Sequence, residues 1–388
     1  MPYSFAHLAD IHLGAFRQPE LRERNLRAFE KAVDLCLERG ADFIIIAGDL
    51  FHSPLPEMGV VDRAVKKMRE FTDSGRQIYV VYGSHDYSPT ETSMIDVLNS
   101  AGVLTKIAYG ERVQGKLRPG FVEDERTGVK LAGLNARRGG MELDSFKELD
   151  QEALEKEAGR KIFVFHSAIE EYKPDYLKGV AGVPKSLLPK GFDYYASGHV
   201  HERRIEKNGD GWLAFPGQLW AADFRDLEAL SKQKSGFLVF REGNKPEFME
   251  VDAGSVCAYE LDAKGMSATR VVEEVRALQK KECDVSLVRV FGEMNGNPGE
   301  VDWEAVKASF PSETVYLNKN SLERESAERV RVKSRERSEI EEELLGEAFG
   351  DPSKALSLLA VLKAEQASGE RKTDFEARVC REAEAALK

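Results

Sequence analysis

Short apolar runs and amphipathic segments alternate over the first hundred residues of the chain. Runs of mostly apolar and β-branched residues predict strands, and apolar positions that recur every three or four residues predict helices. The strands are expected at 4–9, 43–46 and 77–82, and the helices at 21–39, 60–71 and 92–100. Strands joined by helices in this order pair in parallel within one sheet and carry the helices on its faces.

After residue 100 the pattern changes. Residues 103–135 consist of short strand-like segments separated by glycine and charged turns, which indicates an antiparallel section. A charged helix is expected at 146–158, and further strands follow it at 161–165, 192–197, 212–215 and 236–240. The pattern therefore predicts an α/β main domain over residues 1–250.

Three shorter segments follow the main domain. Residues 255–322 alternate strands and helices and contain no histidine, so we expect a small α/β unit without chemistry of its own. Residues 323–338 are dense in charge and are expected to form a linker. Leucine-rich helices are expected at 339–388, and short helices cannot bury that much leucine among themselves. Such a tail needs either the main body or a partner protein to cover it.

Composition narrows the class of protein. The 388 residues carry a net charge of −11, so any contact with DNA needs local basic patches or bound cations. No apolar run approaches the ~20 residues of a membrane span. Residues 1–7 lack the charged start and apolar block of a signal peptide, so we expect a cytoplasmic protein. The four cysteines form no zinc or redox motif.

Candidate chemistry gathers where the predicted strands end. Asp10 and Asp49 follow the first two strands, and six of the seven histidines lie at or just beyond strand ends. These six are His12, His52, His85, His166, His199 and His201. Imidazoles mixed with carboxylates, without thiolates, suit manganese, iron or zinc. The ligands are too many for one tetrahedral ion and suit two, with Asp49 placed to bridge them, which predicts a hydrolase of phosphate esters.

Five motifs occur in order at these strand ends. They are Asp10-x-His12, Gly48-Asp49, Gly83-x-His85-Asp86, His166 and Gly198-His199-x-His201. This set resembles the calcineurin-like metallophosphoesterase superfamily and, within it, the Mre-eleven (SbcD-type) DNA double-strand-break repair nucleases. The resemblance implies a four-layer β-sandwich flanked by helices, a DNA-binding capping domain at 255–322 and an ATPase-docking helical element at 339–388.

The resemblance also implies roles for individual residues around two manganese ions. One metal would take Asp10, His12, Asp49 and His201, and the other would take Asp49, Ser84, His166 and His199. His85 would face the scissile phosphate, Asp86 would orient His85, and His52 would make a lesser contact with the phosphate.

One position departs from the family pattern. The family usually has asparagine between the glycine and the histidine of the third motif, and this chain has Ser84. A hydroxyl reaches less far than an amide oxygen. We therefore expect Ser84 to ligate weakly, or a water to replace it, and the second metal to bind more weakly than the first.

The activity that the resemblance implies is that of a 3′–5′ double-strand exonuclease and single-strand endonuclease working with a Rad-fifty (SbcC-type) coiled-coil ATPase. A homodimer is expected through apolar residues of 60–71 and 94–98, although helix-to-sheet packing explains many of them. DNA would be held by its backbone, with candidate contacts from Arg17, Arg137, Arg138, Arg203 and Arg204. Two alternatives stay open, namely a phosphodiesterase for small phosphoesters and a weakly catalytic scaffold that tethers DNA ends.

Overall fold

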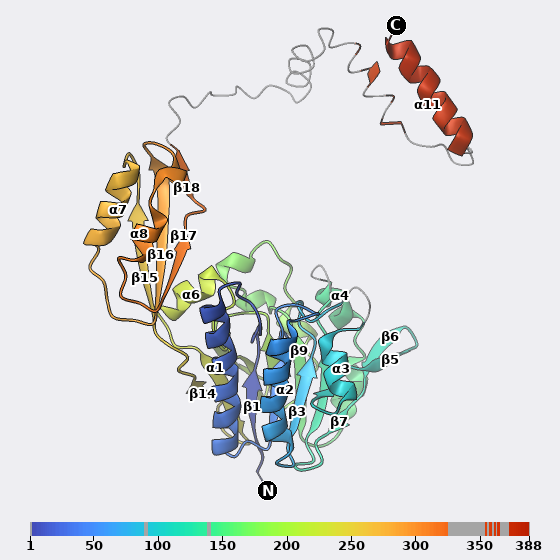
Figure 1. Cartoon of the computed structure of the whole chain (residues 1–388). Coiled ribbons are helices and arrows are strands. Elements are labelled where there is room, and N and C mark those ends of the chain that lie inside the picture. Colours follow the sequence, from blue (N-terminus) through green and yellow to red (C-terminus); the bar gives the residue numbers. More distant parts are fainter. Residues whose placement is uncertain are drawn as a thin grey trace. The chain divides into compact units, whose positions relative to one another are not determined.

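In the computed structural model the chain divides into two units, residues 1–325 and 326–388 (Figure 1). The structure describes residues 2–88, 92–137, 141–324 and 372–387, and residues 354, 357, 358, 361, 363 and 364. In the second unit the described element is helix α11 (Lys372–Leu387). Most of the predicted linker and of the remaining predicted tail lies outside the described residues.

The first sheet has six strands in the order β14-β13-β1-β2-β3-β4. They are β1 (Ser4–Leu8), β2 (Phe43–Ala47), β3 (Gln77–Val81), β4 (Thr105–Lys106), β13 (Gly236–Arg241) and β14 (Glu247–Glu250). Strands β1 to β4 are parallel, whereas β13 runs antiparallel to both β1 and β14. Every residue of β2 is buried, because other layers cover both faces of the sheet.

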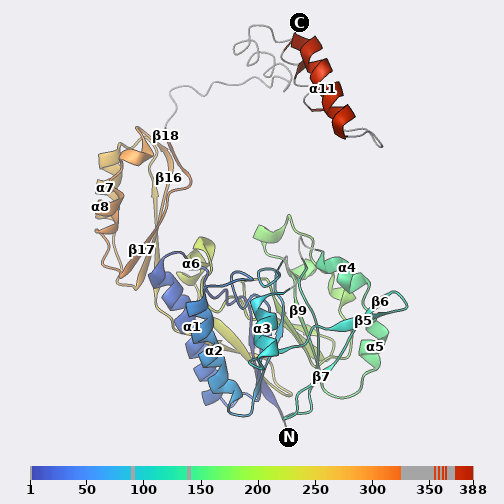
Figure 2. The same cartoon turned by 45° about the vertical axis from the view of Figure 1, so that its right-hand side comes forward.

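Three helices cover the outer face of the first sheet (Figures 1 and 2). They are α1 (Pro19–Glu38), α2 (Met58–Thr72) and α3 (Met94–Ser100). Phe29 of α1 and Met68 of α2 belong to the same apolar core as Ile44 and Ile46 of β2. Alternate residues of β2 therefore face the helices, as the strand periodicity requires.

The second sheet has the order β11-β12-β10-β9-β8-β7. Its strands are β7 (Val122–Glu123), β8 (Lys130–Leu134), β9 (Lys161–His166), β10 (Tyr194–Gly198), β11 (Arg204–Asn208) and β12 (Gly211–Phe215). Ile162 and Val164 of β9 share an apolar core with Phe43 and Ile45 of β2, so the two sheets pack face to face. Helices α4 (Glu142–Lys147) and α5 (Gln151–Lys156) contribute Phe146 and Leu154 to the core on the outer face. The order helix, sheet, sheet, helix gives the four layers that the resemblance implies.

Two details of the sequence interpretation were wrong. The helix expected at 146–158 is two helices, because the Asp150 side chain accepts a hydrogen bond from the N–H of Ala153 and begins α5. The section at 103–135 is only partly antiparallel. Strands β5 (Gly110–Val113) and β6 (Lys116–Pro119) form an antiparallel hairpin, whereas β4 and β8 extend the parallel parts of the two sheets.

A third, smaller sheet follows the sandwich. It contains β15 (Val256–Asp262), β16 (Val285–Met294), β17 (Thr314–Asn318) and β18 (Leu322–Arg324), and its helices are α7 (Ala268–Ala277) and α8 (Trp303–Lys307). Its strands pair in parallel around an apolar core of their own. Arg289 of β16 forms an ion pair of 2.8 Å with Glu228 of α6 (Phe224–Leu230). No helix among the described residues is long and apolar enough to cross a membrane.

Candidate metal centre

Histidine and aspartate side chains meet at the carboxyl edge shared by the two sheets. Asp10 and His12 follow β1, Asp49 follows β2, His166 ends β9, and His199 and His201 follow β10. Asp10, His12, Asp49 and His199 have positive φ angles of 50°, 49°, 53° and 75°. Residues other than glycine seldom adopt this backbone, and such strain concentrates at functional sites.

Two glycines allow this crowding. A Cβ atom on Gly48 would lie 2.3 Å from Nδ1 of His166, and one on Gly83 would lie 2.1 Å from Oδ1 of Asp49. No side chain fits at either position without moving a candidate ligand. The need to exclude any side chain therefore explains why glycine begins the Gly-Asp and Gly-x-His-Asp motifs.

Asp10, His12 and His201 form the first candidate group, with ligand atoms within 4.8 Å of one another. The Nε2 atoms of His12 and His201 are 3.4 Å apart, and Nε2 of His201 lies 3.9 Å from Oδ1 of Asp10. Nδ1–H of His201 donates to Oδ1 of Asp226 at 2.8 Å. This contact directs Nε2 of His201 toward Asp10, as carboxylates do for metal-binding imidazoles.

Asp10, Asp49 and His166 form the second candidate group, and all three are buried. Nδ1–H of His166 donates to the carbonyl oxygen of Ala47 at 2.8 Å, so Nε2 faces the carboxylates. Oδ2 of Asp49 lies 3.3 Å from Nε2 of His166 and 3.6 Å from Nε2 of His12. Asp10 belongs to both groups, and Asp49 of the second group also lies near His12 of the first, so either carboxylate is placed to bridge two cations.

Burial and mutual attraction set the charges of this cluster. Burial raises the pKa of Asp10 to about 6 and lowers that of His12 to about 3. Burial alone would lower the pKa of His166, but the Asp49 carboxylate raises it to about 10. Burial would likewise raise the pKa of Asp49, which His166 and His12 instead hold below its usual range. The site stabilises negative charge on Asp49, which suits it to bind cations.

Several buried atoms here have no hydrogen-bond partner. They include Oδ2 of Asp10, Nδ1 of His12 and Nε2 of His166. Leaving a buried polar atom unpaired costs about 1–3 kcal/mol. The orphaned oxygen and nitrogen donors, without thiolates, fit divalent transition-metal cations.

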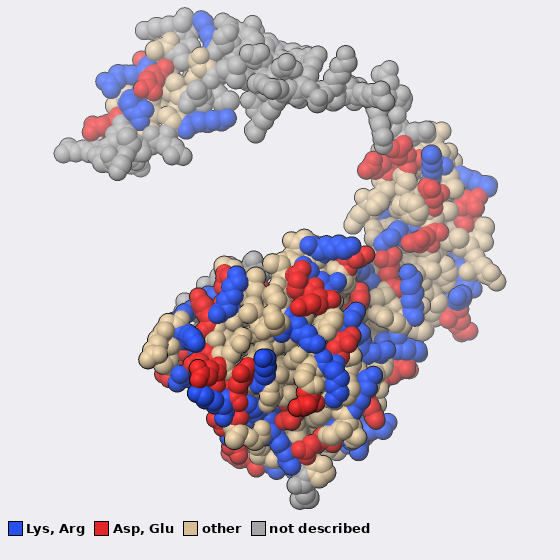
Figure 3. Space-filling model, turned by 180° about the vertical axis from the view of Figure 1, so that it is seen from behind, with Lys and Arg blue, Asp and Glu red and all other residues tan. Residues whose placement is uncertain are grey.

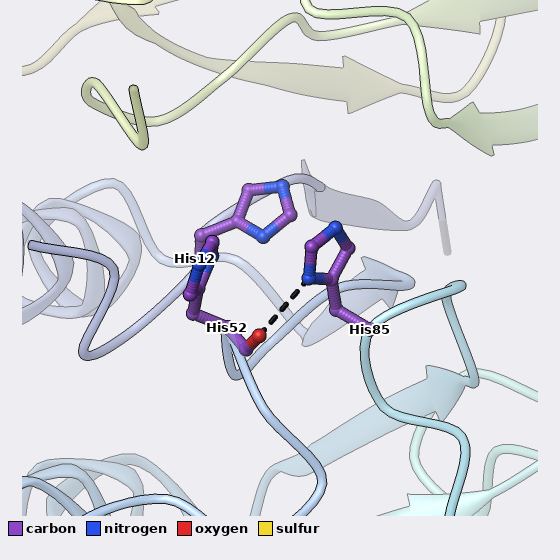
Figure 4. A group of neighbouring side chains, drawn as sticks. All are labelled: His12, His52 and His85. Atoms are coloured by element: carbon purple, nitrogen blue, oxygen red, sulfur yellow. Dashed lines mark hydrogen bonds between the residues drawn. The ribbon is translucent and has the colours of Figure 1, made fainter. Parts of the chain in front are cut away.

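His12, His52 and His85 form a third group (Figure 4). Nδ1–H of His85 donates to the carbonyl oxygen of His52 at 3.0 Å, and the two rings stack with centroids 4.9 Å apart. His85 is exposed to solvent, while His12 is buried. The contact with the carbonyl leaves Nε2 of His85 available to a substrate.

Asp86 was expected to orient His85, and this expectation was wrong. The Asp86 carboxylate accepts hydrogen bonds from the backbone N–H groups of Leu50, Phe51 and Gly83. Three backbone donors outcompete an exposed ring for a buried carboxylate. Asp86 therefore ties the loop after β3 to the loop after β2, and the His52 carbonyl orients His85.

The other predicted site residues differ in exposure and in the contacts that they make. His199 is partly buried with its ring centroid 5.3 Å from that of His166, whereas Ser84 is exposed. Arg17 and Arg137 are exposed, Arg203 stacks on the Phe248 ring, and Arg204 pairs with Glu206. Arg138 lies outside the described residues. Asp226 was missed, because no motif in the sequence links it to a histidine 25 positions earlier.

Comparison with known proteins agrees with this geometry. Residues 3–203, which contain all of the motifs, match the calcineurin-like phosphoesterase family. The DNA double-strand break repair protein Mre11 of Archaeoglobus fulgidus is 27% identical over 84% of this chain and 72% of its own length. The protein of the same name from Methanopyrus kandleri is 29% identical over 83% of this chain and 72% of its own length.

A solved structure of TT1561 from Thermus thermophilus is 15% identical and covers 65% of this chain and 100% of its own, with a TM-score of 0.40. That score is too low to add to the family match. The family match and the curated relatives agree with the ligand-rich strand ends. The chain therefore belongs to the calcineurin-like phosphoesterase family, as a metal-dependent hydrolase of the Mre11 type.

Proposed function

We propose that this chain is a manganese-dependent DNA nuclease that processes double-strand breaks as a 3′–5′ exonuclease on duplexes and an endonuclease on single strands. The observation that carries the proposal is the position of the Asp49 carboxylate, which lies 3.6 Å from Nε2 of His12 in one ligand group and 3.3 Å from Nε2 of His166 in the other. The names of its relatives, which are DNA double-strand break repair proteins, support DNA as the substrate.

The candidate ligands would hold two manganese ions. One ion would be held by Asp10, His12 and His201. The other would be held by His166 and His199, with Ser84 or a water as a further ligand, and Asp49 would contact both ions. Paired divalent cations supply an activated water and neutralise charge on the attacked phosphate. The chain's own contribution is rigidity, because Ala47 and Asp226 fix the rings of His166 and His201.

His85 would act on the substrate from the exposed side of the site. Its Nδ1–H is held by the His52 carbonyl, so a proton carried at Nε2 can pass to the leaving oxygen. His52 lies beside it, and burial followed by repulsion from His85 lowers the pKa of His52. A neutral His52 can donate its remaining ring N–H to a phosphate oxygen without supplying the proton for the leaving group.

DNA binding would depend on local contacts. Acidic and basic side chains are interspersed on the face shown in Figure 3, which offers no broad basic surface to a duplex. Arg17 and Arg137 are exposed and remain candidate phosphate contacts. Arg203 and Arg204 are weaker candidates, because their guanidinium groups already contact Phe248 and Glu206.

Two protein partners belong to the proposal, a second copy of this chain and an ATPase. Most apolar residues of α2 and α3 lie in the protein's own core, so helix-to-sheet packing accounts for them. Leu55, Met58 and Val97 are instead 74%, 62% and 52% exposed, and they could pack across a two-fold axis. The tail would bind a Rad-fifty (SbcC-type) ATPase, and the complex would act in the cytoplasm beside the nucleoid.

Digestion of end-labelled DNA tests the proposed function. Purified protein would be incubated with blunt duplex, single-stranded circles and a nitrophenyl phosphodiester, each with manganese or with magnesium. We expect manganese-dependent shortening of the duplex and nicking of the circles. Hydrolysis of the nitrophenyl diester with both DNAs left intact would favour a small-molecule phosphodiesterase instead.

His85→Ala is the variant that separates catalysis from binding. Loss of a general acid lowers the rate about 10²–10⁴-fold, and the exposed ring contributes little to the core. DNA affinity, measured by fluorescence anisotropy, should stay the same. Unchanged cleavage by this variant would favour the scaffold alternative.

A further inference from the structure

A pocket of about 300 Å³ lies at the same edge of the sandwich as the histidine cluster. Tyr87, Tyr109, Leu117, Pro119 and Arg137 are among its lining residues, and we call it the tyrosine pocket. Its wall includes the hairpin of β5 and β6, which Figure 1 shows at the margin of the sandwich near α4. The volume is at the lower end of ~300–1,000 Å³ for ligand sites, which suits one planar group.

Backbone hydrogen bonds connect the tyrosine pocket to the catalytic edge. Tyr82, the first residue after β3, donates its N–H to Oδ1 of Asn135 at 2.8 Å and accepts from N–H of Ala136 at 2.9 Å. The ends of β3 and β8 are thereby joined. Tyr87 follows His85 by two residues, so their Cα atoms are within roughly 7 Å. A strand whose phosphate meets His85 can therefore reach the pocket with a neighbouring nucleotide.

The two tyrosines present ring surface to solvent. Tyr87 is 38% exposed and Tyr109 is 53% exposed. The Tyr109 ring is nevertheless fixed, because its hydroxyl donates to the carbonyl oxygen of Phe121 at 3.1 Å. The ring also lies over Gly120, where a Cβ atom would be 2.6 Å from Cε2 of the tyrosine. An exposed ring that is held at one end and supported below can stack on a ligand with little loss of entropy.

Charge at the rim favours an anionic ligand. The Arg137 side chain is exposed and has no ion-pair partner within the described part of the chain. Its backbone N–H donates to Oε1 of Glu142 at 3.0 Å, which fixes the position of the residue. Arg112, which also lines the pocket, is already paired with Glu148. Arg137 is therefore the cation available to a phosphate.

We propose that the tyrosine pocket binds an unpaired base at the end of a DNA strand, with Tyr87 and Tyr109 stacking on the base and Arg137 contacting an adjacent phosphate. This inference rests on the proposed function and specifies its substrate. Bases inside a duplex are stacked on their neighbours and cannot enter the pocket. Aromatic stacking tolerates any base, so the pocket selects frayed or single-stranded ends without selecting sequence.

Fluorescence of 2-aminopurine tests binding to the tyrosine pocket independently of DNA cleavage. The probe is a duplex with a two-nucleotide unpaired end that carries 2-aminopurine, and binding is measured without divalent cations. We expect the emission to fall on binding, because stacking quenches it. Tyr109→Ala and Tyr87→Ala should each weaken binding of this end about 5- to 150-fold. A blunt duplex should bind equally well to wild type and variants.

Two further variants separate stacking from structure. Tyr109→Phe keeps the ring and should bind the unpaired end nearly as well as wild type. Gly120→Ala keeps the tyrosine but displaces its ring, and should weaken binding as Tyr109→Ala does. Circular dichroism verifies that each variant is folded. Equal affinity of wild type and Tyr109→Ala for the unpaired end, or equal losses on the blunt duplex, would overturn the proposal.

The outcomes distinguish this inference from the proposed function. If the unpaired end binds through Tyr109 but manganese yields no cleavage of any DNA, the pocket stands and the nuclease assignment fails. If DNA is cleaved but the tyrosine variants cleave frayed and blunt ends at wild-type rates and bind both normally, the nuclease stands and the pocket fails. Hydrolysis of a nitrophenyl phosphodiester should be the same in all variants, because none alters a candidate ligand.

Discussion

His201 reaches the metal centre only because a second residue holds its ring. Asp226, at the start of α6, accepts from Nδ1–H of His201 and from the N–H of Ala222. Burial alone would lower the pKa of His201, but the hydrogen bond to Asp226 raises it to about 9. Asp226 is thus a positioning residue whose charge strengthens the imidazole as a ligand.

Replacement of Asp226 by asparagine should weaken metal binding without unfolding the protein. The amide keeps the volume but loses the charge that polarises His201, and such contacts contribute about 10–100-fold in metal affinity. Manganese affinity is measured by electron paramagnetic resonance of the free ion. Glu228→Gln, on the same helix but paired with Arg289, is the matched control and should bind normally. Equal affinities of the two variants would contradict the role of Asp226.

His7 gives the protein a pH-dependent stability that is separate from the metal centre. It is buried in β1 with Nδ1 3.0 Å from the Tyr194 hydroxyl, and burial lowers its pKa to about 3. The unfolded chain takes up a proton near pH 6.5, and the folded chain does so only near pH 3. This difference removes up to about 1.4 kcal/mol of stability per pH unit as the pH falls through that range.

His7→Phe removes this titration and should therefore change how stability depends on pH. Urea unfolding of variant and wild type between pH 7 and pH 4.5 gives the difference in their free energies of unfolding. The variant should gain relative to wild type as the pH falls below 6.5, and the two should differ by a constant above it. A difference that is constant over the whole range would show that His7 has the same pKa in the folded and the unfolded chain.

Candidate metal ligands were predictable from the sequence where they follow the ends of predicted strands. Asp10, Asp49 and His166 each come directly after an apolar run, and parallel strands place such residues at one edge. The partners that fix the rings were not predictable. Asp226 and the His52 carbonyl are set by tertiary packing between distant segments, and hydrophobic periodicity carries no signal for them.

At the scale of elements, the turn after β2 contacts both sheets. Gly48 directly follows Ala47, whose carbonyl oxygen accepts a hydrogen bond from His166 of β9. A turn of the first sheet is thereby bonded to a strand of the second sheet. Gly40, which follows α1, has a similar left-handed backbone, with φ of 69° compared with 88° at Gly48. The two glycines share this backbone conformation and differ only in what surrounds them. Substitutions at the two positions can therefore be compared as a matched pair.

Gly48→Ala should cost more stability than Gly40→Ala. Alanine at either position strains a left-handed backbone by ~1–2 kcal/mol. Its Cβ atom meets nothing within 4 Å at Gly40 but would lie 2.3 Å from His166 at Gly48. We expect about 1–3 kcal/mol of additional destabilisation at Gly48 and a loss of manganese affinity that Gly40→Ala does not show. Equal effects in urea unfolding and metal titration would refute this account.

Element type was easier to predict than element pairing. Strands β1, β2, β3, β9 and β10 and helices α1 and α2 follow from apolar periodicity. The parallel pairing of β4 with β3 did not, because β4 has only two residues and takes its direction from its neighbour. The break between α4 and α5 follows from Asp150, whose capping role competes with helix propensity.

At the scale of the whole molecule, α6 connects the sandwich to the third sheet. Asp226 of α6 holds His201, and two residues later Glu228 pairs with Arg289 of β16. Val256, Val285 and Leu287 of the third sheet belong to the same apolar core as α1 and α2. The third sheet is therefore packed on the sandwich within residues 1–325.

Truncation after residue 325 should separate the two activities that we propose for the chain. All contacts described for the metal centre and the third sheet lie within residues 1–325. The shortened chain should keep the thermal unfolding midpoint and the manganese-dependent nuclease activity of the full chain. Binding to the proposed coiled-coil ATPase partner, measured by co-purification, should be lost. Loss of both nuclease activity and ATPase binding would refute this modular organisation.

Side chains from separate strand ends are expected to hold a pair of cations that share Asp49. Anomalous diffraction from a manganese-soaked crystal tests it most directly. The account predicts two peaks about 3.5–4 Å apart, one beside Asp10, His12 and His201 and the other beside His166 and His199, with Asp49 in contact with both. A single peak, or one found only among His12, His52 and His85, would contradict it.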